Sequence, residues 1–233
     1  EWSDPETWEG GSVPDDDARV LVREDVSVVV ASELDTRLDT VRVDGTLSFD
    51  PTVDTRLPVD TLVTTLGSTL RIGTEVEPVR PDATARMLFV DRGAIDEQRD
   101  PDRVGRGLIV MGEFEVHGAE TTPWTELEAA PRAGDRTLSL PEPPTNWSPG
   151  DELVIPGVDP LEDQDEEVRV ASVDGSTVRL DRSLEYDHVP PASGLPAYVV
   201  HLTRNVRFVS ESREIPRRGH IMIHSASDRK SVV

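Results

Sequence analysis

The chain has 233 residues, of which 46 are Asp or Glu and 24 are Lys or Arg, so its formal net charge at pH 7 is −22. That balance argues against a nucleic-acid-binding protein, which needs a basic surface to contact phosphates. The absence of Cys excludes disulfides and cysteine-based metal sites, and no apolar run is long enough to predict a membrane-spanning helix.

The excess of acidic residues favours adaptation to high salt over a merely acidic surface. Near molar salt the Debye length falls to about 3 Å, so repulsion between carboxylates is screened while their hydration remains. We therefore expect a halophilic protein whose melting temperature rises toward molar NaCl.

Residues 1–119 form the first expected unit, in which three segments share one strand pattern. Each segment alternates apolar and polar side chains, as a half-buried strand does, and has Gly at or just before its start. The three segments are 45–49, 68–72 and 112–116. Their middle residues lie 23 and 44 positions apart, which indicates a repeat of about 22 residues. Residues 26–28 fit one step earlier, and residues 87–90 fall near the position of a missing rung.

A strand repeat of this length predicts a solenoid, in which each coil buries its apolar face against its neighbours. Val dominates the apolar residues, and 19 Pro with 16 Gly interrupt the chain often. No helical periodicity persists for three turns. The sequence therefore predicts an all-β protein.

Residues 120–197 lack the repeat and indicate a small antiparallel β-barrel inserted into the solenoid. Two strand-like segments, 168–173 and 177–180, flank Asp174-Gly175-Ser176, which is a strong hairpin signal. The acidic stretch 159–167 is expected to be an exposed loop.

Residues 198–224 return to the strand pattern and are expected to form the first coils of a β-helix. Residues 225–233 form an unpatterned tail that contains the single Lys, Lys230. The chain starts at Glu1 without Met or a signal segment, so we interpret it as a mature or excised fragment.

Several short motifs occur together in one order. They are Trp2-Ser3-Asp4-Pro5-x-Thr7-Trp8, Val43-x-Gly45-Thr46-Leu47, Leu70-Arg71-Ile72-Gly73-Thr74-Glu75-x-Glu77-Pro78, Gly107-x-x-Val110-Met111-Gly112, His117-Gly118, Trp147-x-x-Gly150-Asp151-Glu152 and Leu202-Thr203-Arg204-Asn205-Val206. In this order and spacing the chain resembles the G8 domain family, named for its recurring glycines. The family occurs in extracellular proteins that include a hyaluronan-binding, cell-migration-inducing protein with bacterial and archaeal relatives, and fibrocystin.

The resemblance implies a right-handed parallel β-helix that starts from the G8 unit, and an extracellular or cell-surface location. We expect the fragment to be a carbohydrate-binding module of a larger polysaccharide-active protein, with a polysaccharide or glycan as its partner. One alternative is the N-terminal part of a hyaluronidase-like depolymerase, in which the fragment alone is not the enzyme. Another is a structural cap of a β-helical adhesin or surface protein.

Four residues are candidates for the site. The resemblance suggests a functional role for His117, because a His at a strand end can act as acid or base near neutral pH. Trp124 and Trp147 are expected in loops, where an exposed Trp can stack on a sugar ring. Arg204 is the third candidate for ligand binding.

The remaining polar and aromatic clusters favour structural roles. Trp2 and Trp8 are expected to cap the open end of the solenoid, and His188 and His201 to be structural. His220 and His224, four residues apart on a strand, are about 13 Å apart and do not suit one metal ion. We expect no cofactor and no metal; Ca²⁺ at Asp15, Asp16 and Asp17 is the alternative to a solvated acidic turn.

Overall fold

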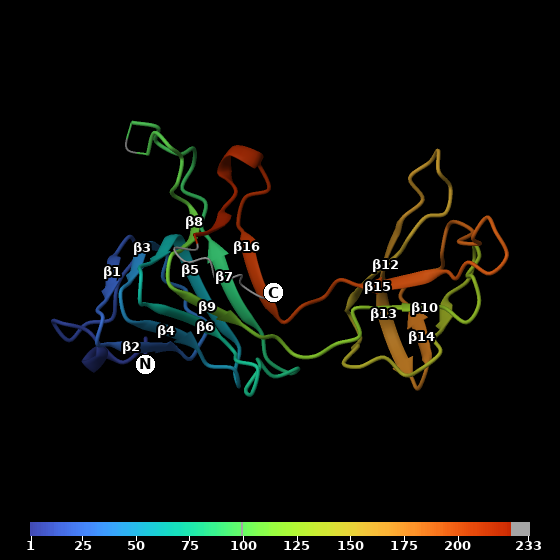
Figure 1. Ribbon diagram of the computed structural model, residues 1–233, viewed down its shortest axis with the longest axis horizontal. Helices are drawn as coiled ribbons and strands as arrows, with labels where there is room; N and C mark the ends of the chain where they lie inside the picture. The colour runs from blue at the N-terminus through green and yellow to red at the C-terminus, as the bar shows by residue number, and fades with distance from the viewer. Residues whose placement is uncertain (99, 225–233) are drawn as a thin grey trace. The chain divides into compact units, whose positions relative to one another are not determined.

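The computed structural model describes residues 1–98 and 100–224, which form two compact units. Of the described residues, the first unit contains 1–98, 100–119 and 205–224, and the second contains Glu120–Arg204 (Figure 1). The described chain is all-β, since its only helices are two single turns of 3-10 helix, η1 (Pro5–Thr7) and η2 (Ile215–Arg217). Within the described residues, no helix has the length and apolar character needed to cross a membrane.

One sheet of the first unit contains the predicted ladder. Its four parallel strands are β2 (Ser27–Val30), β4 (Thr46–Phe49), β6 (Thr69–Ile72) and β9 (Glu113–Val116). The middle residues Leu47, Leu70 and Phe114 are direct register partners, and Val28 precedes them in the same row. The ladder predicted from alternation and glycine position is therefore confirmed at Leu47, Leu70 and Phe114, whereas the strand expected at residues 26–28 lies at Ser27–Val30.

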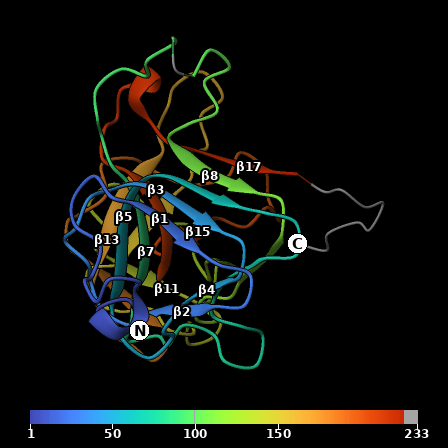
Figure 2. The same cartoon turned by 90° about the vertical axis from the view of Figure 1, so that its left-hand side faces the viewer.

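A second parallel sheet of seven strands faces the ladder across a shared apolar core. Its strands are β1 (Arg19–Val22), β3 (Leu38–Val43), β5 (Thr55–Thr64), β7 (Ala85–Phe89), β8 (Gly107–Val110), β16 (Val206–Ser210) and β17 (His220–Ile223). The long strand β5 pairs with β7 along its first half and with β8 along its second half. In the next layer β16 pairs with β7, and β17 lies beside β8 (Figure 2).

The split of β5 corrects the expectation of a missing rung at residues 87–90. These residues lie at the end of β7 or just after it, and β7 belongs to the seven-stranded sheet. The ladder strand β9 stacks directly on β6. The 44-residue spacing therefore reflects an insertion between β6 and β9, not an additional coil.

Two ladder glycines are required by the close approach of successive coils. A Cβ atom on Gly45 would lie 2.0 Å from the carbonyl oxygen of Arg23, and one on Gly112 would lie 2.3 Å from that of Ser68. At the N-terminal end, buried Trp2 donates its main-chain N–H to Val29 and packs edge-on against Trp8 at 4.9 Å. This agrees with the expected capping role of the two tryptophans.

The second unit is a sheet path of six antiparallel strands around its own core. Their order is β10 (Trp124–Glu126), β15 (Tyr198–His201), β12 (Glu152–Ile155), β13 (Glu166–Asp174), β14 (Thr177–Leu180) and β11 (Thr137–Ser139). The predicted hairpin is present between β13 and β14, and Gly175 has a positive φ of 57° at its turn. Next to the two end strands, Glu128 N–H donates to the carbonyl of Ser139 at 3.0 Å.

Two boundary expectations need correction. Residues 198–201 do not begin the returning coils, because β15 pairs antiparallel with β10 and β12 of the second unit. The first unit resumes at Asn205 rather than at residue 198.

The acidic stretch is exposed from residue 159 to residue 163, but Glu166 is buried at its end. The predicted tail, 225–233, lies outside the described residues.

Candidate functional site

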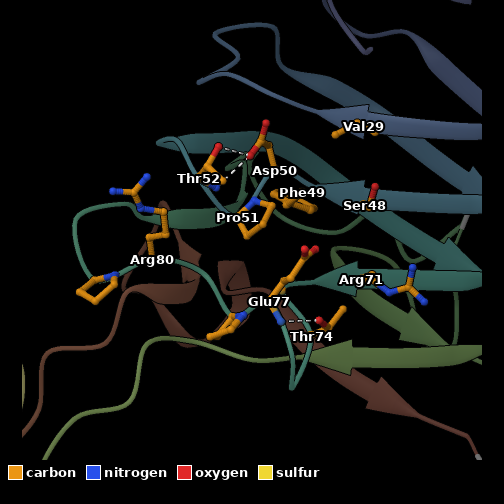
Figure 3. Close-up of a pocket in the computed structure, with 13 residues that line it drawn as sticks. Val29, Ser48, Phe49, Asp50, Pro51, Thr52, Arg71, Thr74, Glu77 and Arg80 are labelled. Carbon is orange, nitrogen blue, oxygen red and sulfur yellow. Dashed lines mark hydrogen bonds between the residues drawn. The ribbon is translucent and has the colours of Figure 1, made fainter.

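The first unit carries a hollow of about 660 Å³ on the outer face of its ladder sheet (Figure 3). The outward side chains of neighbouring strands Val29, Ser48 and Arg71 are register partners and form its base. Residues 50–52, after β4, and residues 73–74, 77–78 and 80–81, after β6, supply its walls. The volume lies in the range of about 300–1,000 Å³ that small-ligand sites occupy.

The loop after β6 is held by local hydrogen bonds and by strand β9. Thr74 N–H donates to the carbonyl of Glu77 at 2.9 Å, and Glu77 N–H donates to the Thr74 hydroxyl at 2.8 Å. These two bonds close a tight turn. Val79 N–H donates to the carbonyl of His117 at 2.9 Å. Gly73 has a φ of 70°, and a Cβ atom there would lie 2.3 Å from the same carbonyl, so a side chain at this position would displace the wall.

The opposite wall is equally ordered. One carboxylate oxygen of Asp50 accepts hydrogen bonds from the main-chain N–H and the hydroxyl of Thr52, at 2.8 and 2.6 Å. Arg80 N–H donates to the carbonyl of Pro51 at 2.9 Å, which connects the two walls. The hollow is therefore preformed by the loops rather than assembled by a ligand.

The charges around the hollow are unevenly compensated. The Arg71 guanidinium binds Glu115 at 2.9 Å, and Arg80 binds Asp82 through two bonds of 3.0 and 2.9 Å. Across residues 1–98 and 100–224, no hydrogen-bonding or ionic partner faces the side-chain carboxylate of Glu77, which points into the hollow (Figure 3). The unpaired charge of the hollow is negative.

His117 lies directly after β9, beside the wall rather than in it. Its side chain is 40% exposed, and its Nε2 is 3.8 Å from a carboxylate oxygen of Glu115, the partner of Arg71. Its main chain both accepts from Val79 and donates to Ile72. A catalytic role for His117 stays a prediction.

The second unit exposes a pair of aromatic rings. Trp124 is 58% exposed and Tyr198 is 38% exposed, with ring centroids 5.8 Å apart in an edge-to-face arrangement. The predicted loop position of Trp124 is wrong, because it begins β10, opposite Val200 of β15. Glu126 faces Tyr198 across the same pair of strands and accepts from the Tyr198 hydroxyl at 3.5 Å.

Trp147 is not available to a ligand, which corrects the second aromatic candidate. It is 6% exposed, donates its indole N–H to the carbonyl of Thr122 at 2.8 Å, and stacks on His201 at 5.2 Å. His201 is buried as well and binds Asp151 at 3.0 Å. Trp147 therefore packs the core of the second unit.

Arg204 is exposed, but its guanidinium hydrogen-bonds the main chain at the end of β15. It donates to the carbonyls of His201 and Thr203, at 2.8 Å each. Ligand binding by Arg204 stays a prediction, and these bonds give it a structural role.

A buried ionic cluster in the second unit was missed by the sequence interpretation. Glu166, which is 2% exposed, binds His188 at 3.0 Å and Arg182 at 2.9 Å, and it accepts main-chain N–H groups of Glu185 and Tyr186. Burial raises the pKa of the Glu166 carboxyl, but these hydrogen bonds outweigh it, so the pKa lies below its ordinary value. His188 places its other ring nitrogen 2.9 Å from the carbonyl of Pro156, as the structural role expected for it requires.

The acidic turn near the N-terminus is occupied by protein groups. Asp16 accepts the main-chain N–H of Arg37 at 2.7 Å, and Asp17 binds the guanidinium of Arg92. Over the part of the chain that the structure describes, no three His, Cys, Asp or Glu side chains are grouped to hold a metal ion.

Comparison with known proteins finds one family. The G8 domain pattern matches residues 7–128. Human Fibrocystin-L (Homo sapiens) is 30% identical over 219 residues, which cover 88% of this chain and 5% of that protein. Mouse Fibrocystin-L (Mus musculus) is 28% identical over 220 residues, with the same coverage. The chain thus spans about a twentieth of the length of these relatives.

Two solved structures show weak likeness. The tailspike gp61 of Pseudomonas phage phi297 has a TM-score of 0.29 and 16% identity, covering 77% of this chain and 24% of that one. The Gp54 tailspike of Acinetobacter baumannii bacteriophage AP22, solved in complex with A. baumannii capsular saccharide, has a TM-score of 0.30 and 17% identity, covering 74% and 24%.

Proposed function

The chain belongs to the G8 domain family, and on that premise we propose that it is a carbohydrate-binding module of a longer, extracellular polysaccharide-active protein. The observation that carries the proposal is the exposed pair Trp124 and Tyr198. Large aromatic rings at a surface offer apolar faces to the C–H faces of sugar rings, while their N–H and O–H groups meet hydroxyls. Glu126, beside Tyr198, adds a hydrogen-bond acceptor.

The same proposal extends to the architecture. The first unit would be the start of a right-handed parallel β-helix, and the second a small β-barrel inserted into it. The stacking of β16 on β7 and of β17 on β8 supports continued coils. The hydrogen bond between Glu128 and Ser139 supports closure of the inserted strands.

The binding proposal is tested by removing the aromatic pair. Retention on immobilised polysaccharides near molar NaCl should fall about tenfold in Trp124→Ala and in Tyr198→Ala, which corresponds to about 1.4 kcal/mol. Tyr186→Ala is the matched control, because Tyr186 is also 38% exposed and lies in the same unit. Unchanged retention in both variants, or no retention of the unaltered protein on any polysaccharide, would reject the proposal.

A second candidate is catalysis by the longer protein, with His117 as a proton-transfer group. It is favoured by the array of His117, Glu115 and Arg71 beside the hollow. Polysaccharide cleavage by the longer protein should then be lost in His117→Ala while the melting temperature is kept. A fully active variant would end this candidate.

A further inference from the structure

We propose that the hollow on the ladder sheet is a separate saccharide subsite that selects sugar rings without a carboxylate. This inference rests on the proposed carbohydrate binding, and it adds a position in the first unit and a rule for ligand charge. It involves none of the aromatic residues of the second unit.

The base of the hollow favours recognition by side chains. Its central strands β4 and β6 each have a paired neighbour on both sides, so their main-chain groups are already used in the sheet. An extended peptide therefore has no free strand edge to join at the centre of the hollow. A ligand in the hollow must therefore be bound by the side chains that project from the strands and from the wall loops.

Those projecting groups suit a sugar ring. Val29, Pro51 and Pro78 provide apolar surface, while Ser48 and Thr74 provide hydroxyls that can donate or accept. The Glu77 side chain rises from its loop toward Phe49 and Pro51, so its carboxylate reaches the space above the apolar surface (Figure 3). Apolar walls with a few converging polar groups match a ring that has a C–H face and a hydroxyl edge.

The charges determine which sugar. A carboxylate accepts hydrogen bonds from two adjacent hydroxyls or from an amino group, whereas it repels a uronic acid. The nearby cations Arg71 and Arg80 are each bound to a carboxylate of the protein, so neither is left to pair with the carboxylate of a uronic acid. Neutral and amino sugars are therefore the ligand class, and uronates are rejected.

The test measures binding of oligosaccharides of equal length made of glucose, N-acetylglucosamine, glucosamine or galacturonate. The intact chain should bind at least one of the first three and bind galacturonate least. Glu77→Gln should weaken that binding about fivefold and reduce the discrimination against galacturonate. Ser48→Trp, which fills the base of the hollow, should weaken it more than tenfold. Glu75→Gln is the matched control, since Glu75 is exposed on the same loop but does not line the hollow.

The outcomes separate this inference from the function on which it rests. If the intact chain binds none of the four sugars, the subsite is overturned, whereas the module falls only if the chain is also retained on no immobilised polysaccharide. If Trp124→Ala abolishes binding while Glu77→Gln and Ser48→Trp leave it unchanged, the subsite is overturned and the module stands. Stronger binding of galacturonate than of the other sugars overturns the charge rule. If Ser48→Trp fails to fold, the comparison of oligosaccharide binding between Glu77→Gln and Glu75→Gln still tests the subsite, and equal binding by these two variants overturns it.

Discussion

The two units stabilise their strands in different ways. In the first unit every strand pair is parallel, with partners such as Arg19 and Thr40 on successive coils, and each coil is held by the coil before it. In the second unit every pair is antiparallel, and a charged cluster around Glu166 lies inside the fold. A repeating stack can leave most of its charges at its loops, whereas the smaller unit places a carboxylate within its core region.

The contrast also appears in the polar groups that join distant segments. In the first unit Asn205 donates to the carbonyls of Val79, Arg80 and Ala83 at 3.0, 2.9 and 3.2 Å, and accepts the N–H of Ala119 at 2.9 Å. This amide is uncharged. Glu166 accepts from two main-chain N–H groups as well as from His188 and Arg182, so its loss should cost more than the loss of the Asn205 amide.

The largest effect is expected from Glu166→Ala. The change leaves the buried His188 ring and the main-chain N–H groups of Glu185 and Tyr186 without their shared acceptor, and each buried group left unsatisfied costs about 1–3 kcal/mol. Calorimetry should show the second unit melting far earlier, with the transition of the first unit unchanged. Glu167→Gln, at an exposed neighbour, is the control, and an equally small effect of both would contradict the buried cluster.

Asn205→Asp should have the next largest effect, on the first unit. The substitution places a carboxylate oxygen against the three carbonyl oxygens that the amide now contacts, at a cost of about 2–3 kcal/mol. Denaturant unfolding of the first unit would report it. Asn146→Asp changes the other asparagine, whose amide donates one hydrogen bond to Glu120 in the second unit, and it should cost less than 1 kcal/mol.

Acid should next weaken the first unit through Glu211. Hydrogen bonds from the Arg37 guanidinium, at 2.7 Å each, lower the pKa of the Glu211 carboxyl from 4.5 to about 2. Because the folded pKa lies below the unfolded one, the stabilisation is complete above about pH 4.5 and is lost as the pH falls toward 2.

Melting of the first unit followed from pH 6 to pH 2 checks this. Glu211→Gln should cost about 1–2 kcal/mol at neutral pH and flatten the acid dependence. Glu214→Gln, at a more exposed carboxylate in the same segment, should leave the profile in place. A profile that is the same in both variants would show that Glu211 does not carry the effect.

The smallest expected effect is a difference between the two units in how much added salt raises their melting temperatures. Residues 120–204 contain 17 acidic and 6 basic residues, so the second unit carries half of the net charge of −22 on fewer residues. Screening should therefore raise its melting temperature by a few degrees toward molar NaCl, and raise that of the first unit less. Two melting temperatures that stay constant or fall with added NaCl would reject the halophilic interpretation.

The sequence predicted those features of the fold that depend on a local pattern of residues. Alternation and glycine placement gave the rungs at Leu47, Leu70 and Phe114, and Asp174-Gly175 gave the hairpin. It did not predict that Tyr198 pairs with Glu126, because the two residues are 72 positions apart and nothing in either strand specifies its partner.

The site depended on the same long-range information. Trp124 and Trp147 have similar polar surroundings in sequence, yet one is 58% exposed and the other 6%. Glu166 stands within a run of acids that favours solvent, and its burial is explained by Arg182, His188 and the main-chain N–H groups of Glu185 and Tyr186. The Glu77 hollow had no signal in the sequence, since it is formed by loops from different coils.

The contact between Ala119 and Asn205 has a consequence for synthesis. The two residues are 86 positions apart, so at about 5–20 residues per second a ribosome needs roughly 4–17 s to pass from one to the other. During that interval β1 to β9 are already made, but the loop of Val79 and Ala83 still lacks the amide that will bind it. The whole second unit is translated before that amide emerges, so the first unit is begun first and completed last.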